Sequence, residues 1–396
     1  MRKFLHNTGS LRKMNKGMIR IPYAAVWILL IQMYGCSPSN PGQEVQADQP
    51  EHSPQTMLLK DWQPESIYKV PETNIEKAKY PVIDMHDHDE AKTPEEVAKL
   101  VKIMDETGIE KSVIFTNATG SRFDSIYALY SKYPDRFMVY CGFDFSDFPN
   151  DGWSDKAIAE LRRCVKVGAA GIGELHDKGA GLVPGMHPDD PRMDPIFDAC
   201  AEMNLPINLH IADPMWMYLP MDSTNDGLMR SWTWRIKDAD RVVDHAGLMK
   251  ILANTLKRHP NNKFVIAHLA NCAYDFSILA NLFDTYPGFY ADISARFSEF
   301  STIPRVANRF FEKYQDRLVY GTDYIWETWD STGDYGNHTT TEQMFRMTFR
   351  VLETEDDHFY LTDLVGYKWP MYGLGLTDGA LEKIYRTNAL KVIGSR

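Results

Sequence analysis

The chain has 396 residues, of which 44% are hydrophobic, and its formal net charge is −11. This composition supports a sizeable folded core and argues against disorder of the main body. The acidic balance argues against nucleic-acid binding, because a protein that binds a phosphate backbone needs clustered Lys and Arg.

The first 35 residues form a segment unlike the rest of the chain. They carry six basic residues and no acidic one, and an apolar run, IPYAAVWILLIQMYG, leads to Cys36. This order is typical of a secretory signal peptide, and a run of about 15 residues is shorter than the ~20 of a membrane-spanning helix. Gly35-Cys36 followed by SPSNPGQE resembles a bacterial lipoprotein signal, although Met33 and Tyr34 depart from its usual pattern. The resemblance implies that Cys36 is the lipidated first residue; an uncleaved N-terminal anchor is the alternative.

Either anchor places the body of the protein outside the cytoplasmic membrane, facing the periplasm or the cell surface. Residues 36–60 are rich in Ser, Pro, Gln and acidic residues, which predicts a flexible tether before a folded body over 61–396. Without residues 1–35 the chain keeps 37 basic and 54 acidic residues, a net charge of −17. Such a surface does not dock on anionic lipid by charge, so we expect membrane contact through the N-terminal lipid alone.

The cysteines of the body give no sign of a disulfide framework. Four remain besides Cys36, and none has CxxC spacing. We expect them to be small buried hydrophobic side chains, while their disulfide state stays open. They are Cys141, Cys164, Cys200 and Cys272.

Short apolar runs alternate with longer amphipathic segments from residue 81 onward. The apolar runs predict strands at 81–86, 111–117, 137–144, 169–176, 205–212, 263–269, 288–294 and 317–323. Helical patterns lie between them at 93–108, 154–168, 193–204 and 247–260. The first of these helices has Thr93 as a cap and Pro94 in its first turn.

This alternation predicts the fold class α/β, with a TIM-like (β/α)8 barrel in a single domain. Near-continuous apolar strands, each followed by a helix, are typical of a parallel sheet closed into a barrel. An open doubly wound sheet is the alternative, but it usually has a glycine-rich phosphate loop after its first strand. This chain has MHDHDEAKTP at that place, which favours the barrel.

The barrel model predicts where the chemistry lies, because active sites of such barrels lie at the carboxyl ends of the strands. Polar side chains of metal-binding or acid–base type end five of the predicted strands. They are His86 and His88, Glu174, His210, His268 and Asp323. Imidazole nitrogens and carboxylate oxygens suit a divalent cation, with zinc favoured and Mn, Fe or Ni left open.

The segment of residues 213–246, after the fifth predicted strand, is long for a compact domain. It is rich in Trp, Met and Arg, so it is either a functional loop or lid, or a small excursion with its own core. Trp216 and Arg230 in this loop are candidate substrate contacts. Arg296, just after the seventh strand, is a candidate partner for a substrate carboxylate.

From residue 81 to its C-terminus the chain resembles the metal-dependent amidohydrolase superfamily, in the branch that includes aminocarboxymuconate-semialdehyde decarboxylase. The tail GLTDGALEKIYRTNALKVIG and the HIADP after the fifth strand carry the resemblance together with the strand-end residues. It implies that His86, His88 and His210 are metal ligands, and that Asp323 is both a ligand and a proton shuttle.

The resemblance leaves two of the strand-end residues open. His268 binds a second metal, polarises the attacked group or orients water. Glu174 bridges two metals, as in binuclear relatives, or supports the site as a structural acid. The number of ions, one or two, therefore stays open.

Three classes of function compete on this evidence. The leading one is hydrolysis of a C–O or C–N bond in a small ester, lactone or amide by a metal-activated water, which Glu174 favours slightly. A non-oxidative decarboxylase is the alternative enzyme, and a tethered binding lipoprotein without catalysis is the non-enzymatic one. A TatD-like nuclease fits least, given the acidic charge. The substrate stays open, as does the oligomeric state, with a homo-oligomer allowed.

Overall fold

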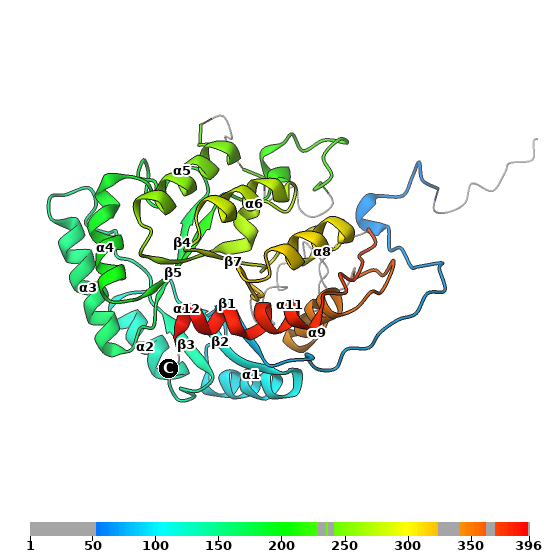
Figure 1. Ribbon diagram of the computed structural model, residues 1–396, viewed down its shortest axis with the longest axis horizontal. Helices are drawn as coiled ribbons and strands as arrows, with labels where there is room; N and C mark the ends of the chain where they lie inside the picture. Colours follow the sequence, from blue (N-terminus) through cyan, green and yellow to red (C-terminus); the bar gives the residue numbers. More distant parts are fainter. Residues whose placement is uncertain (1–52, 229–234, 237–240, 324–339, 362–368, 395–396) are drawn as a thin grey trace, which may run out of the picture. The chain divides into compact units, whose positions relative to one another are not determined.

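The computed structural model describes residues 53–228, 235–236, 241–323, 340–361 and 369–394 (Figure 1). The chain divides into two compact units, residues 1–57 and 58–396, and the description below concerns the second. The predicted signal and its Cys36 lie outside the described residues. Within the described residues, no helix is both long enough and apolar enough to cross a membrane.

A strand is present at each of the eight predicted places. The strands are β1 (Val82–His88), β2 (Ile109–Phe115), β3 (Phe137–Tyr140), β4 (Ile172–Asp177), β5 (Pro206–Ile211), β6 (Lys263–Ile266), β7 (Tyr290–Asp292) and β8 (Leu318–Val319). They pair in parallel in two sheets, in the orders β1-β2-β3 and β4-β5-β6-β7-β8. Parallel pairing in sequence order is the arrangement that a helix after each strand allows.

Backbone contacts join the two sheets into a closed barrel. A parallel bridge between Cys141 and Ile172 links the end of β3 to β4. At the other junction, the backbone N–H of Met85 donates to Tyr320 O at 2.9 Å. The (β/α)8 barrel predicted from the sequence is therefore confirmed.

Helices cover the outside of the sheets, as Figure 1 shows for α1 to α6. The longer ones are α1 (Pro94–Thr107), α2 (Gly120–Tyr130), α3 (Trp153–Val167), α4 (Asp194–Glu202), α5 (His245–Arg258), α6 (Phe276–Thr285), α8 (Pro304–Lys313) and α9 (Thr341–Glu353). Shorter ones are α7 (Phe297–Phe300), α11 (Asp378–Glu382) and α12 (Asn388–Ile393), the last two joined by a π-helical turn. The predicted cap of α1 is present as a capping box, in which Thr93 accepts from the Glu96 N–H.

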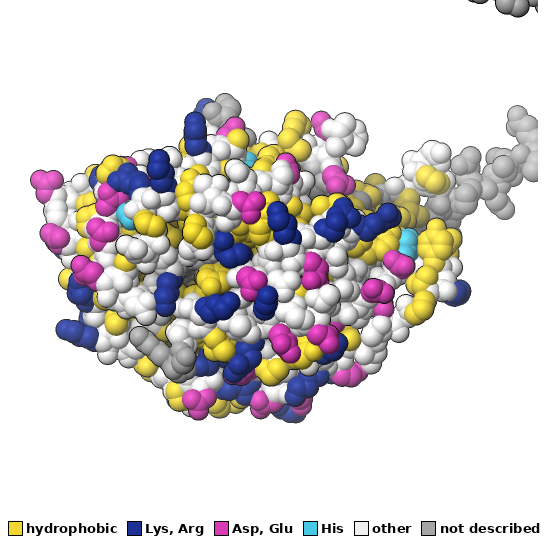
Figure 2. Space-filling view, viewed as in Figure 1, with side chains coloured by type: hydrophobic (Ala, Val, Ile, Leu, Met, Phe, Trp, Pro, Cys, Tyr) yellow, Lys and Arg dark blue, Asp and Glu magenta, His cyan; other side chains and the backbone are white. Residues whose placement is uncertain are grey.

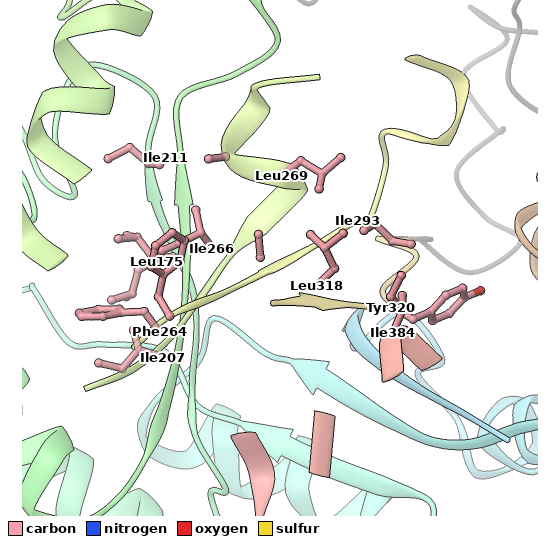
Figure 3. Packing of buried hydrophobic residues seen from close by; sticks show 14 of the residues in the cluster. Leu175, Ile207, Ile211, Phe264, Ile266, Leu269, Ile293, Leu318, Tyr320 and Ile384 are labelled. Atoms are coloured by element: carbon pink, nitrogen blue, oxygen red, sulfur yellow. The ribbon is translucent and has the colours of Figure 1, made fainter. Parts of the chain in front are cut away.

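Two clusters of buried hydrophobic residues hold the barrel together. The larger cluster packs strands against helices, and Figure 3 shows part of it, with Leu175, Ile207 and Phe264 from successive strands. The smaller one contains Phe115 and Tyr140 together with residues of α12. In β2 and β3, neighbouring residues alternate between the two clusters, as expected for strands with one face toward the helices and one toward the barrel interior.

The positions of the cysteines and of the charged side chains agree with what the composition predicts. The four cysteines of the body are buried, as predicted, and their disulfide state, which the sequence left open, is unpaired. Basic and acidic side chains are interspersed over the face in Figure 2. Such mixing keeps large fields of one sign off that face.

Candidate active site

The candidate site begins with His86 near the end of β1, where the pairing of β1 with β2 shifts register between Asp84 and Asp87. The His86 side chain is completely buried, and its Nδ1 donates to Asp292 Oδ2 at 2.9 Å. Its Nε2 makes no hydrogen bond to any described residue. A buried polar nitrogen without a partner is costly, so we expect a ligand at this place.

His88 and Asp323 complete a first group around this nitrogen. Asp323 Oδ1 lies 3.0 Å from His88 Nε2 and 3.4 Å from His86 Nε2. The three ligand atoms lie within 4.8 Å of one another. The backbone N–H of Asp323 donates to His86 O at 2.8 Å, so hydrogen bonding between the ends of β8 and β1 places the carboxylate.

Glu174 and His268 form a second group with the same histidine. Glu174 Oε1 lies 3.6 Å from His86 Nε2 and 3.4 Å from His268 Nε2. The His268 ring is held from behind, with Nδ1 at 2.8 Å from Ser294 Oγ and 3.2 Å from Ser294 O. A carbonyl oxygen only accepts, so Nδ1 carries the proton and Nε2 presents a lone pair to the group.

His210 lies in a third group, with Glu174 and His176. Its Nδ1 is 2.8 Å from Glu174 Oε1, and His176 Nε2 is 2.6 Å from Glu174 Oε2. The structure therefore brings together all six strand-end residues predicted from the sequence. His210 groups with Glu174 and His176 rather than with His86 and His88.

Sequence reasoning missed Asp292, whose carboxylate orients two histidines of the site. This buried carboxylate at the end of β7 accepts from His86 Nδ1, from the His268 N–H at 2.9 Å and from Asn208 Nδ2 at 3.1 Å. The signal was present in GFYADIS, because this aspartate lies near the carboxyl end of a predicted strand. His176, two residues after Glu174, was visible in the same way.

The imidazoles and carboxylates of the site shift the pKa values of one another. Burial disfavours charge, but Asp292, Glu174 and Asp323 together raise the pKa of His86 well above its ordinary value. The imidazoles in turn hold the pKa of Glu174 and of Asp323 well below that of a free carboxyl, against the effect of burial. Burial and the neighbouring His210 lower the pKa of His268 to about 4, so this ring is neutral near pH 7.

Two of the candidate substrate-binding residues, Trp216 and Arg296, contact the same carboxylate, that of Glu299. Trp216 Nε1 donates to Glu299 Oε1 at 3.3 Å, and Arg296 Nη1 donates to the same oxygen at 3.0 Å. Arg296 is buried and paired, so its charge already has a carboxylate partner. Arg230 lies outside the described residues.

Comparison with known proteins identifies the chain. Residues 69–394 match the family model described as Amidohydrolase. The chain belongs to the amidohydrolase family.

Individual relatives of this amidohydrolase are distant. A gamma-resorcylate decarboxylase from Rhizobium radiobacter is 24% identical over 290 residues, which cover 62% of this chain and 82% of the decarboxylase. Among solved structures, 4-oxalomesaconate hydratase from Rhodopseudomonas palustris is 16% identical with a TM-score of 0.48, covering 79% of this chain and 95% of that one. An uncharacterized TIM-barrel protein from Bordetella bronchiseptica is 12% identical with a TM-score of 0.47, covering 79% and 98%.

The residues of this amidohydrolase fit a divalent cation. Two histidines, His86 and His268, are held by oxygen acceptors at Nδ1, which leaves their Nε2 atoms facing Glu174. Ligating histidines in proteins are commonly held in this way by a carboxylate or a carbonyl. His86, His88 and Asp323 add a second facing set. The donor set of imidazole and carboxylate suits zinc and related ions.

Proposed function

We propose that this amidohydrolase is a metal-dependent hydrolase that cleaves a C–O or C–N bond in a small ester, lactone or amide. The observation that carries the proposal is the position of Asp323. Its carboxylate contacts both histidines of the first group, yet its side chain is 24% exposed, whereas that of His86 is fully buried. Asp323 therefore connects the buried ligands with the open side of the barrel.

In the proposed hydrolysis, the residues of the site would have separate roles. His86, His88 and Asp323 would hold the ion, with Glu174 and His268 facing it from the other side. When bound, a divalent cation lowers the pKa of a coordinated water towards neutrality. Asp323 Oδ1 faces His86 and His88, whereas Oδ2 lies 3.8 Å from His268 Nε2. Oδ2 would therefore be the oxygen that accepts the proton of the attacking water and passes it to the leaving group.

His268 serves best as a ligand or as an acceptor. Its Nδ1 carries the proton that faces Ser294, and its pKa of about 4 keeps the ring neutral. A neutral ring in this tautomer has no N–H to offer toward the cluster. Of the three roles that the sequence left open for His268, polarisation of the attacked group by a donated hydrogen bond is the least supported.

Charge near the site favours an uncharged substrate. Arg296 pairs with Glu299 at 3.0 Å, and Lys178 pairs with Asp213 at 3.0 Å. A substrate carboxylate would have to compete with these acidic partners for either cation. This pairing supports an ester, lactone or amide over a carboxylic acid.

A decarboxylase remains a second candidate because of the sequence relative. The gamma-resorcylate decarboxylase matches this chain over 82% of its own length. In that reaction Asp323 would deliver a proton to the carbon that loses carbon dioxide. The same ligands serve both chemistries, so the products must decide.

The deciding experiment uses the full chain reconstituted with Zn²⁺. It is assayed in H₂¹⁸O against nitrophenyl esters, lactones and N-acyl amides, and against hydroxybenzoic acids for carbon dioxide. Incorporation of ¹⁸O into the product supports the hydrolase. Carbon dioxide release without ¹⁸O incorporation overturns it in favour of the decarboxylase. Less than about half an equivalent of metal after reconstitution would favour a binding protein without catalysis.

A further inference from the structure

We propose that an apolar patch at the rim of the barrel docks on the surface of a lipid bilayer. The patch consists of the exposed side chains of Leu58, Trp62, Ile67, Tyr68, Ile303 and Val306. This inference goes beyond the proposed hydrolysis, and it rests on attachment of the chain to a membrane through its N-terminus. It adds an apolar contact to the lipid anchor that the sequence predicts.

The patch contains the most exposed large hydrophobic side chains among the residues that the structure describes. Ile67 is 82% exposed, Leu58 is 58% exposed and Tyr68 is 56% exposed. These three residues lie within eleven positions of one another, at the start of the folded unit. Exposed apolar side chains that gather in this way mark a surface that binds a partner or a membrane.

Contacts between distant parts of the chain bring the patch together. The Ser66 hydroxyl lies 3.1 Å from His358 Nδ1, and the ring centroids of Tyr68 and His358 are 4.6 Å apart. The same imidazole lies against Tyr372, with ring centroids 6.2 Å apart, and the Tyr372 N–H donates to Ser301 O at 3.1 Å. Ser301 directly follows α7. The N-terminal part of the patch is therefore linked to the turn between α7 and α8, where its other part begins.

The patch lies at the end of the barrel that carries the candidate site. The helix α7 follows the carboxyl end of β7, and its Glu299 accepts from Arg296 and from Trp216 of the segment after β5. The carboxyl ends of the strands form the active-site end of such a barrel. Docking beside α7 would therefore turn the open side of the site toward the lipid.

The charges around the patch suit a bilayer surface. Residues 58–69 contain two basic and two acidic residues, so this segment is neutral within an acidic chain. On α8, Arg305 and Arg309 flank Val306, are exposed, and have no acidic partner among the described residues. Figure 2 shows basic side chains next to hydrophobic ones over this region. Apolar side chains flanked by free arginines can enter the bilayer boundary while the guanidinium groups stay with lipid phosphates.

The chain before the patch favours a bilayer over a second copy of the protein. Leu58 lies 22 residues after Cys36, and a flexible segment of that length spans roughly 25 Å. A lipidated Cys36 would hold the patch within that distance of the bilayer, whereas a second copy would have to diffuse to it. Trp62 and Tyr68 are also the residue types that proteins place at a membrane–water interface.

The first test measures contact of the patch with lipid. The full chain is bound to vesicles of phosphatidylcholine, either unmodified or brominated on its acyl chains, because brominated lipid quenches tryptophan at the bilayer boundary. We expect brominated lipid to quench the native chain and to quench Trp62→Phe at least ~2-fold less. Ile67→Asp should reduce the quenching of Trp62 by a similar factor, because a carboxylate stays out of the apolar boundary.

Asn261→Asp is the charge-matched control for Ile67→Asp. Asn261 is exposed between α5 and β6, at the opposite end of the barrel, so the added charge there should leave the quenching unchanged. Circular dichroism of each variant shows that it is folded. Equal quenching of the native chain and of Trp62→Phe would overturn the proposal.

A second test identifies what covers the patch. Benzoylphenylalanine in place of Ile67 should form an adduct with lipid after illumination of the vesicle-bound chain, whereas the same group in place of Asn261 should not. An adduct with a second copy of the chain in place of lipid would overturn the proposal. A native chain that does not sediment with vesicles would overturn both the attachment and the docking, and would leave the proposed hydrolysis intact.

Discussion

At the scale of single residues, the site is organised by carboxylates that hold imidazoles in place. Asp292 supports His86 and also accepts the backbone N–H of His268, and Asp213 supports His210. Each imidazole ring is thereby fixed in one orientation, with one nitrogen facing the cluster. The facing nitrogens converge on Glu174. Removal of a supporting carboxylate should therefore act on the metal through the imidazole.

Asp292→Asn tests this support. We expect affinity for Zn²⁺ to fall by ~10- to 100-fold, because an amide keeps the shape of the side chain but loses the charge that orients His86. Asp284→Asn is the control, since that carboxylate is 62% exposed and lies away from the cluster. The affinity for Zn²⁺ is measured by competition with a chromophoric chelator. Unchanged affinity in Asp292→Asn would show that the contact of Asp292 with His86 is structural only.

Asp323→Asn separates binding from proton transfer. The amide oxygen can still face His88, so we expect metal content to stay near that of the native chain. Turnover should fall by ~10²- to 10⁴-fold, the usual contribution of a general base. Metal analysis and kcat are measured on the same preparation. A parallel loss of both would reduce Asp323 to a ligand.

At the scale of elements, strained backbone conformations occur directly after the strands. Ala212, His268, Ala295 and Asp323 have φ between 53° and 63°, in the left-handed region, and follow β5, β6, β7 and β8. Such a conformation costs an ordinary residue ~1–3 kcal/mol, and residues of this kind cluster at functional sites. The strain thus marks the carboxyl end of the barrel, where the histidines and carboxylates gather.

Gly321→Ala tests how closely β8 must approach β1. A Cβ at Gly321 would lie 2.8 Å from His86 Cβ, which is shorter than side chains allow. We expect a loss of ~1–3 kcal/mol in the free energy of unfolding, together with weaker metal binding, because His86 must shift. Gly379→Ala is the matched control, since a Cβ there meets nothing within 4 Å and the residue is helical. Chemical denaturation that shows equal stability for both variants would contradict the argument.

Asp356 predicts how stability depends on pH away from the site. Burial would raise its pKa, but the Thr73 hydroxyl and N–H and the Arg350 guanidinium, at 2.8 Å, hold it below the ordinary value. A depressed pKa gives stability that is present above ~4, the unfolded value, and is lost as pH falls through the folded value. Asp356→Asn should therefore cost about 1.5–3 kcal/mol at pH 7 and less at pH 3. Urea denaturation at both pH values measures it, and an equal cost at both would exclude the ionised contact.

Sequence patterns predicted the strands well and the contacts between their ends less completely. Apolar runs followed by His86, Glu174 or His268 are local signals, and the barrel fold turns such local signals into one site. Asp292 was missed because its role depends on a contact between β7 and β1, which no local pattern records. His176 ends the predicted strand at 169–176, but only the register of β4 with β5 shows that it faces His210.

At the scale of the whole molecule, the barrel alone accounts for the candidate site. The barrel carries the entire candidate site, from β1 to the residue after β8. Without residues 1–35 the chain would have a net charge of −17, which disfavours adhesion to anionic lipid. Attachment to a membrane would therefore depend on the N-terminus, through Cys36.

Cys36→Ser tests that attachment in cells. We propose that Cys36 carries lipid and that residues 36–60 act as a tether, whose reach as a random coil is roughly 25–30 Å. The native chain should then partition with membranes and incorporate labelled fatty acid, whereas Cys36→Ser should lose the label and stay at the signal-processing stage or become soluble. Metal content and turnover should not change, because the site lies wholly in the barrel. Cys272→Ser, a buried cysteine of the core, is the control and should keep the label. Membrane partition of the native chain without incorporation of the labelled fatty acid would instead indicate an uncleaved apolar anchor.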